Sequence, residues 1–91
     1  QLILFQNFPN PFNPTTTVEY FLPKQSMVNI SIYDIVGVKV REIYNGFNED
    51  GYHQILWDGT SDSGIDLPSG VYFLHFRHDN IILSKKMVKI K

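Results

Sequence analysis

Apolar and polar residues alternate along several short stretches of the chain, and glycine, proline, asparagine and aspartate separate the stretches. A period of two is the side-chain repeat of a β-strand that buries one face. The pattern predicts strands over Thr17–Leu22, Met27–Tyr33, Val38–Tyr44, Tyr52–Trp57, Val71–Arg77 and Ile81–Lys91. The in-phase apolar residues that predict the core are Val18, Tyr20, Leu22, Val28, Ile30, Ile32, Ile55, Trp57, Tyr72, Leu74 and Phe76. Asn29 and Ser31 are expected to face outward.

The residues between the second and third predicted strands favour a tight hairpin. Within Asp34–Gly37, the aspartate can accept hydrogen bonds from nearby backbone and the glycine is free to adopt a positive φ. In the strand that follows, Ile43 is out of phase with Val40. We therefore expect a β-bulge or a change of sheet near Arg41 and Glu42.

The number and spacing of the strands predict the fold class. No stretch carries the i, i+3, i+4, i+7 spacing of an amphipathic helix over three turns, so helix content should be negligible. We expect an all-β fold, an immunoglobulin/fibronectin-III-like sandwich of about seven antiparallel strands, rather than a barrel. The expected organisation is an extended proline-rich arm over residues 1–15 and a single β-sandwich domain over residues 16–91. A chain this short that starts without methionine also suggests the C-terminal piece of a longer protein.

Composition removes several classes of function. The 91 residues include no cysteine, which excludes disulfides, thiolate zinc sites and cysteine nucleophiles. Eight basic and nine acidic residues give a net charge of −1, so there is no electrostatic reason to expect nucleic acid or an anionic membrane as a partner. No apolar run approaches the ~18 residues of a membrane-spanning helix. We expect a monomer that does not insert into a membrane.

The opening segment is unusual because proline occupies positions 9, 11 and 14. Proline fixes φ and biases the residue before it to extended geometry, so we expect a stiff extended arm. Phe8 and Phe12 would give this arm two apolar anchors.

The same segment, Asn7–Thr16, resembles the Asn-Pro-Phe-Asn-Pro opening of the type A C-terminal sorting domains of the type IX (Por) secretion system in Bacteroidetes-type bacteria. Further motifs of that family follow in the family's order: Leu22-Pro23, Ile32-Tyr33-Asp34 with Gly37, Gly51 and His53, Trp57-Asp58-Gly59, Ser69-Gly70-Val71-Tyr72 and Lys86-Met87. The pattern is also similar to the immunoglobulin-like domain of the flagellar hook-capping protein. Together the motifs extend over Asn7–Lys91, nearly the whole chain.

The resemblance implies a non-catalytic signal that the outer-membrane translocon recognises in the folded state. A surface sortase would then remove the domain or exchange it for a lipopolysaccharide anchor. The parent protein would be secreted or held at the cell surface, reached through the periplasm, with an upstream passenger domain. The last strand is implied to carry most of the recognition, through Lys85, Lys86, Met87, Val88, Lys89, Ile90 and Lys91.

The residues of this tail by themselves support two interpretations. Four of the eight basic residues lie in the last seven positions, and an edge strand with unpaired backbone groups is a template for another chain. Lysines on an edge strand are also the ordinary protection against edge-to-edge aggregation.

Three aspartates raise the question of a metal site. Asp58, Asp62 and Asp66 recur every four residues in a loop with glycines, and hard oxygen ligands suit calcium. The spacing does not match an EF-hand loop, and aspartate, serine and glycine form turns without any metal. We therefore favour turn chemistry with no cofactor, and keep calcium as the minor alternative.

No set of residues in the sequence indicates catalysis, so we do not expect an enzyme. A His-x-x-x-His pair and a Gly-x-Ser-x-Gly motif are both absent. Phase places Trp57 and Tyr72 in the core, and makes Phe21, Tyr33 and Tyr44 the better candidates for exposed aromatics. The alternative function is an accessory module of a secreted enzyme, either carbohydrate-binding or a structural spacer.

Overall fold

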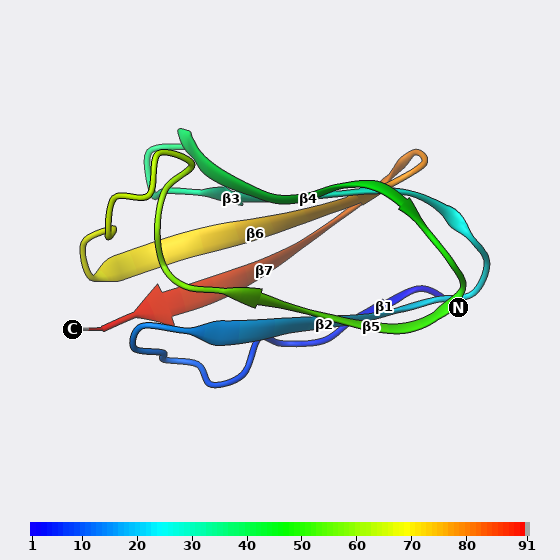
Figure 1. Ribbon diagram of the computed structural model, residues 1–91, viewed down its shortest axis with the longest axis horizontal. Coiled ribbons are helices and arrows are strands. Elements are labelled where there is room, and N and C mark those ends of the chain that lie inside the picture. Colours follow the sequence, from blue (N-terminus) through cyan, green and yellow to red (C-terminus); the bar gives the residue numbers. More distant parts are fainter. Residues whose placement is uncertain (91) are drawn as a thin grey trace.

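The computed structural model describes residues 1–90, which form seven strands and no helix. Their bounds are β1 Ile3–Leu4, β2 Thr16–Leu22, β3 Ser26–Tyr33, β4 Lys39–Asn48, β5 Gly51–Trp57, β6 Gly70–His78 and β7 Ile81–Lys89. Two antiparallel sheets, with strand orders β1-β2-β5 and β4-β3-β6-β7, pack against each other (Figure 1). This confirms the predicted immunoglobulin-like β-sandwich. Within residues 1–90 there is no helix with the length and hydrophobicity needed to cross a membrane.

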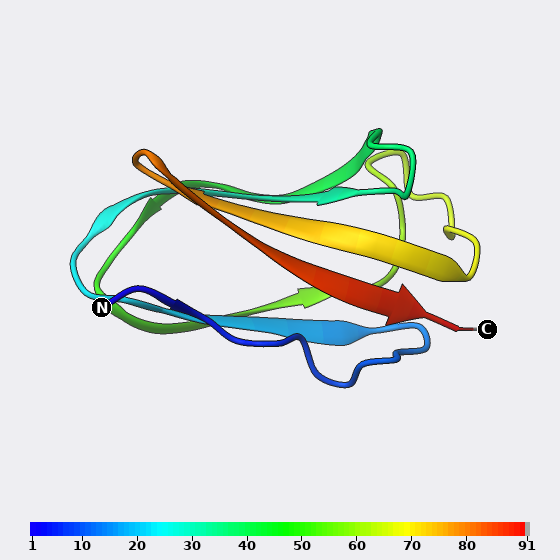
Figure 2. The same ribbon diagram turned by 180° about the vertical axis from the view of Figure 1, so that it is seen from behind.

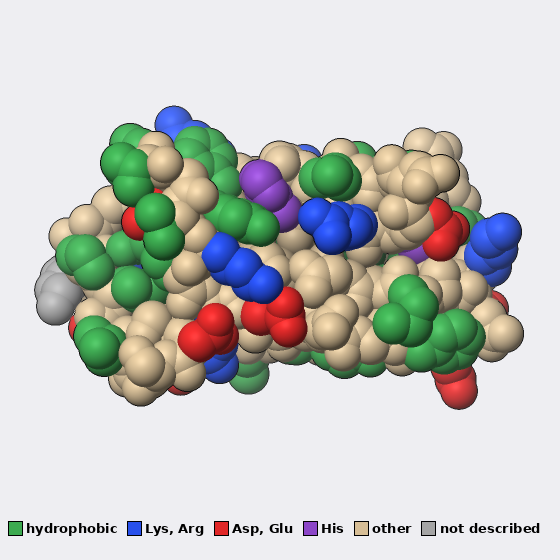
Figure 3. Space-filling model, turned by 90° about the horizontal axis from the view of Figure 1, so that it is seen from above, with side chains coloured by type: hydrophobic (Ala, Val, Ile, Leu, Met, Phe, Trp, Pro, Cys, Tyr) green, Lys and Arg blue, Asp and Glu red, His purple; other side chains and the backbone are tan. Residues whose placement is uncertain are grey.

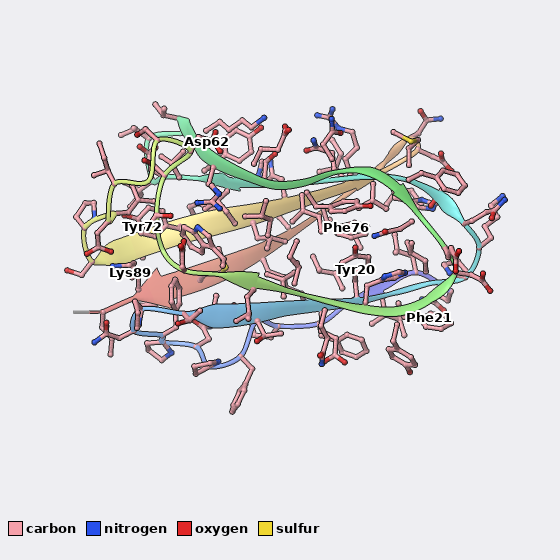
Figure 4. All side chains as sticks on the ribbon, viewed as in Figure 1. Tyr20, Phe21, Asp62, Tyr72, Phe76 and Lys89 are labelled. Atoms are coloured by element: carbon pink, nitrogen blue, oxygen red, sulfur yellow. The ribbon has the colours of Figure 1, made fainter. Side chains whose placement is uncertain are left out.

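The core lies between the two sheets and follows the predicted period of two. Buried apolar residues come from both sheets and from the arm: Leu4, Phe12, Val18, Tyr20, Leu22, Val28, Ile30, Ile32, Trp57, Tyr72, Leu74, Phe76 and Met87. Tyr20 and Phe76 meet edge to face with ring centroids 4.8 Å apart, and both point into the space between the sheets (Figure 4). Trp57 and Tyr72 meet in the same way at 5.9 Å, as their phase predicts. Burying each large apolar side chain stabilises the fold by roughly 1.5–3 kcal/mol.

The outward side of β3 is less exposed than its phase predicts. Asn29 is half-buried and Ser31 is buried, although both lie on the outward side of the sheet as their phase predicts. Its cross-strand neighbours are Glu42 and His75, whose side chains are longer than that of serine. The Ser31 hydroxyl donates a hydrogen bond of 2.9 Å to Asn29 Oδ1, which satisfies this buried polar group.

β4 contains two irregularities, which allow two apolar residues that are out of phase in the sequence to pack on the same face. Its pairing with β3 shifts register twice, and at these shifts Val40 and Ile43 have no partner residue on β3. Both of these side chains pack against the core. The shifts fall on either side of Arg41 and Glu42, so the predicted irregularity is confirmed.

The connection from β3 to β4 is the predicted tight hairpin. Asp34 Oδ1 accepts hydrogen bonds from the backbone N–H groups of Val36 (3.1 Å) and Val38 (2.9 Å). Gly37 has a φ of 90°, a conformation that a side chain would disfavour.

The arm packs along the sandwich. β1 pairs with β2, and Phe8 forms a bridge with Thr17. The chain then bends around residues 9–11 and 13–14 and crosses to β7 (Figure 2). Phe12 is 1% exposed and its ring lies 5.5 Å from that of Trp57, whereas Phe8 is 77% exposed. Phe12 is therefore an anchor and Phe8 is not, because Phe8 pairs with a residue on the outer face of β2 and shares that face.

Candidate functional site

β7 contains most of the predicted recognition residues and lies at one edge of the four-stranded sheet. It pairs with β6 along its whole length, from His78↔Ile81 to Gly70↔Lys89. Backbone groups of an antiparallel strand point alternately to one side and the other. Both the N–H and the C=O of Val88 bond to the arm, so the even-numbered residues of β7 point away from β6.

The arm covers the C-terminal half of this edge. The N–H of Phe12 donates to the carbonyl of Val88, and the N–H of Ile90 donates to the carbonyl of Phe12, each over 2.9 Å. These bonds form a parallel bridge between the arm and β7. The side chain of Asn10 adds a further contact, because its Oδ1 accepts the N–H of Val88 over 2.9 Å. The arm therefore occupies positions that another strand would otherwise take.

The N-terminal half of the same edge is open. Gln6 Nε2 donates to the carbonyl of Lys86 over 2.9 Å, and this is the last contact of the arm with the edge. By alternation, the N–H of Lys86 and both backbone groups of Ser84 and Ile82 point outward. These groups have no partner among residues 1–90. A partner could therefore pair with about half of β7 without displacing the arm.

The side chains predicted for recognition fall into three sets. The buried set is Met87 and Lys89, the half-buried set is Lys85 and Val88, and the exposed set is Lys86 and Ile90. Lys91, the last predicted residue, lies outside the described residues. A partner that meets the folded domain can touch the exposed and half-buried side chains. The buried pair instead holds β7 in the sandwich.

Lys89 is 2% exposed although its side chain carries a charge. Its Nζ donates a hydrogen bond of 2.8 Å to the carbonyl of Leu67 and lies 3.2 Å from Asp66 Oδ1. A buried ammonium group is tolerated when it is paired in this way. A Cβ on Gly59 would lie 2.6 Å from Lys89 Cε, so glycine at that position leaves room for the lysine stem. Figure 4 shows Lys89 at the same end of the sandwich as Tyr72.

The three aspartates considered as calcium ligands have separate hydrogen-bond partners. Asp58 Oδ1 accepts hydrogen bonds from the hydroxyl (2.6 Å) and the N–H (3.1 Å) of Thr60, and the hydroxyl contact lowers the pKa of Asp58. Asp62 Oδ1 accepts the N–H of Glu42 over 3.0 Å, and Asp66 belongs to the buried lysine site. Within residues 1–90, no group of three His, Cys, Asp or Glu side chains is placed to hold a metal ion. The structure does not bring the three carboxylates together.

Arg41 supplies the positive charge of this loop. Its guanidinium donates to the hydroxyl (2.7 Å) and carbonyl (3.2 Å) of Thr60 and to the carbonyl of Ser61 (3.2 Å). It also lies 3.7 Å from Asp58 and 3.9 Å from Asp62. The aspartates therefore help to order a turn around an arginine.

Exposed aromatic side chains lie in places other than those predicted. Phe21, Tyr33 and Tyr44 are all half-buried, and Tyr44 packs against the core. Tyr33 rests on His75 with ring centroids 4.4 Å apart. The exposed aromatics are Phe8, Phe47 and Tyr52.

The face of the molecule seen in Figure 3 has no large region of one charge. Acidic, basic and histidine side chains are interspersed over its middle, and hydrophobic side chains gather mainly at one end, with a smaller group at the other. This distribution agrees with the near-zero net charge of the sequence. It offers no electrostatic surface for nucleic acid on that face.

The fold and one side-chain contact define the class of protein. The Tyr72 hydroxyl donates a 2.6 Å hydrogen bond to the carbonyl of Pro68, four residues earlier, which is the tyrosine-corner contact of immunoglobulin-like sandwiches. The chain is an immunoglobulin-like β-sandwich domain. The family model for the FlgD Ig-like domain matches residues 13–78, and the chain belongs to this family. The comparison with curated proteins finds no match.

Several solved structures share the fold at low sequence identity. Dimeric latent PorU from Porphyromonas gingivalis is 23% identical, with a TM-score of 0.78 over 98% of this chain and 9% of that one. FlgD from P. aeruginosa is 22% identical, with a TM-score of 0.68 over 96% of this chain and 67% of that one. PorZ, an essential bacterial surface component of the type-IX secretion system of Porphyromonas gingivalis, is 19% identical, with a TM-score of 0.63 over 97% of this chain and 11% of that one. The chain thus spans a small part of PorU and PorZ.

Proposed function

We propose that this domain is a non-catalytic sorting domain, which the outer-membrane type IX secretion machinery recognises in the folded state and a surface sortase then removes. The parent protein would pass through the periplasm and end secreted or at the cell surface. The ordered sequence motifs support this proposal, as does the fold shared with PorU and with PorZ, a component of that system. The observation that carries it is that β7 is an edge strand, half of whose free edge is open, with exposed basic and apolar side chains.

The exposure of the β7 side chains bears on which of them such recognition would use. Lys86 and Ile90 are exposed, and they project from the side of β7 opposite the buried Met87 and Lys89. We assign the contact to the outward side chains together with the open backbone groups of Ile82 and Ser84. Main-chain pairing would supply affinity and the side chains would supply specificity.

The test is export of a periplasmic reporter fused to this chain, in a host with the type IX apparatus. The informative variant combines Lys86→Glu with Ile90→Ser, because both positions are exposed and neither change removes a core contact. We expect export to the medium or cell surface to fall at least about tenfold, as for loss of a contact of roughly 1.4 kcal/mol. A deletion of residues 85–91 is less informative, since it removes the buried Met87 and Lys89 and so tests folding.

The matched control combines Lys24→Glu with Ile35→Ser, which makes the same changes at exposed positions in two loops away from β7. Export should be unchanged in the control, and both variants should unfold at the same urea concentration as the wild type. Normal export of the β7 variant would refute the role given to this strand.

The second candidate is a structural spacer, and the extent of the family match favours it. The match covers residues 13–78 and so does not include β7. A spacer would need the fold but not the β7 surface. Export that depends on the domain's presence but not on Lys86 or Ile90 would support this candidate.

A further inference from the structure

The sandwich has four edge strands, of which two are protected against pairing with another chain and a third, β7, is protected over half of its length. β1 is only two residues long. β4 has two register shifts and carries Lys39 and Arg41, and the arm covers half of β7. Short strands, bulges, charges and covering segments are the usual devices that prevent edge-to-edge association. The fourth edge, β5, lacks all of them.

β5 is a regular and uncharged edge strand. It runs for seven residues, Gly51–Trp57, and pairs with β2 without a register shift. It contains no proline, lysine, arginine, aspartate or glutamate. In Figure 1 it runs the length of the three-stranded sheet, with that sheet's other strands on one side only.

The backbone of β5 presents three successive pairing positions to its free side. The backbone groups of Thr17 and Glu19 on β2 bond to the arm, so they point away from β5. In an antiparallel pair, the residues opposite them on β5 must then point away from β2. By alternation, Tyr52, Gln54 and Leu56 direct their N–H and C=O groups outward. None of these backbone groups has a partner among residues 1–90.

The side chains at the same three positions are also exposed. Tyr52 is 67% exposed and Leu56 is 66% exposed, unusually high values for large apolar residues. Tyr52 lies beside Phe21, with ring centroids 4.9 Å apart, and Gln54 and Leu56 border a hollow of about 230 Å³. A strand added at this edge would find apolar contacts at both ends of the row and an amide at its centre.

Charge at the two ends of β5 identifies the occupant. Glu49 and Asp50 precede the strand and Asp58 follows it. In antiparallel self-pairing centred on Gln54, Asp50 of one copy would face Asp58 of the other, which disfavours a second copy of this chain. We infer that β5 binds an extended segment of a different protein, with apolar residues at alternate positions and a basic residue at each end. This surface lies on the other sheet from β7, so the inference does not depend on the proposed sorting function.

The test uses a labelled peptide of sequence Lys-Val-Thr-Val-Thr-Val-Lys, capped at both ends, and fluorescence anisotropy with the full chain. Binding should slow hydrogen exchange at the amides of Tyr52, Gln54 and Leu56 while leaving Ile82 and Ser84 unchanged. A peptide methylated on alternate backbone nitrogens should bind at least about tenfold more weakly, because it lacks the donors that pair with β5. A peptide with glutamate at both ends should also bind more weakly.

Protein variants locate the binding site. Leu56→Lys places a charge on the edge and should abolish binding, whereas Ile35→Lys, at an equally exposed loop position, should not. Both changes are at exposed side chains, and unchanged circular dichroism would show that the fold is intact. Equal binding of the methylated peptide, protection at β7 instead of β5, or no binding at all would overturn the inference. Dimerisation of the chain through β5, seen by sedimentation, would also overturn it, because the occupant would then be a second copy.

Discussion

The Nζ of Lys89 donates a hydrogen bond to the carbonyl of Leu67 inside the sandwich, so the end of β7 is tied to the loop before β6. The lysine stem packs where an aliphatic side chain would otherwise be expected. Its ammonium group is buried and lies 3.2 Å from the carboxylate of Asp66, whose side chain is exposed. A residue predicted to meet a partner is thus part of the structure that holds the strand in position.

The first prediction concerns this lysine. Lys89→Met keeps most of the stem but removes the hydrogen bond and the charge, so we expect a loss of about 1–2 kcal/mol. Lys89→Ala also leaves a cavity, and we expect a loss of about 2–4 kcal/mol. Urea unfolding with an unchanged m-value measures both. Wild-type stability in the alanine variant would show that the buried stem contributes nothing.

The second prediction concerns Gly59, which has a φ of 80°. An added Cβ would lie 2.6 Å from Lys89 Cε and 2.9 Å from the carbonyl oxygen of Pro14, and the latter is backbone that cannot easily move. Gly59→Ala should therefore destabilise by more than about 2 kcal/mol. The control is Gly64→Ala, because Gly64 has a similar φ of 85° and open space around it. That variant should lose about 1 kcal/mol, and equal losses in the two would contradict the steric argument.

The third prediction separates the two phenylalanines of the arm. Phe12→Ala should cost about 3–5 kcal/mol because its ring is fully buried against Trp57. It should also speed hydrogen exchange at Val88 and Ile90, whose N–H groups bond to the arm. Phe8→Ala should change stability by less than about 0.5 kcal/mol. Thermal unfolding of the two variants in parallel provides the measurement, and similar effects would contradict the assignment of Phe12 as the anchor.

The fourth prediction concerns pH. Burial raises the pKa of Tyr20 from its ordinary value of 10.0 to about 12. Because the folded-state pKa is the higher one, the unfolded chain ionises first, and the contribution of this residue to stability is intact below pH 10 and is lost between about pH 10 and 12. The loss should be on the order of 2 kcal/mol. Tyr20→Phe should remove that part of the alkaline decline in stability. In an ultraviolet titration, the wild type should show one tyrosine that ionises near pH 12, and the variant should lack that step.

The alternation of side chains was sufficient to predict the strands and most of the core. Val18, Tyr20 and Leu22 on β2, and Tyr72, Leu74 and Phe76 on β6, are buried as their phase predicts. These predictions succeed because burial within a strand depends on local geometry. The same signal, applied to the tail, would have placed Lys89 inward, because it is in phase with the buried Met87.

The position of the arm could not be predicted in this way. Gln6, Asn10 and Phe12 contact β7, which lies more than seventy residues further along the chain. Nothing local in the sequence specifies that pairing, since it depends on how the two sheets pack. For the same reason, local alternation does not indicate that half of the β7 edge is already covered or that Phe8 is exposed.

The parallel bridge between the arm and β7 has a mechanical consequence. The two segments run side by side in the same direction, and the two ends of the described chain lie at opposite ends of the sandwich (Figure 1). A pull between those ends would act along the strands and so would load the hydrogen bonds of Val88 and Ile90 in shear, all at once. Peeling the same bonds apart one at a time would need less force. A domain built this way resists tension applied along its strands at the contact between the arm and β7.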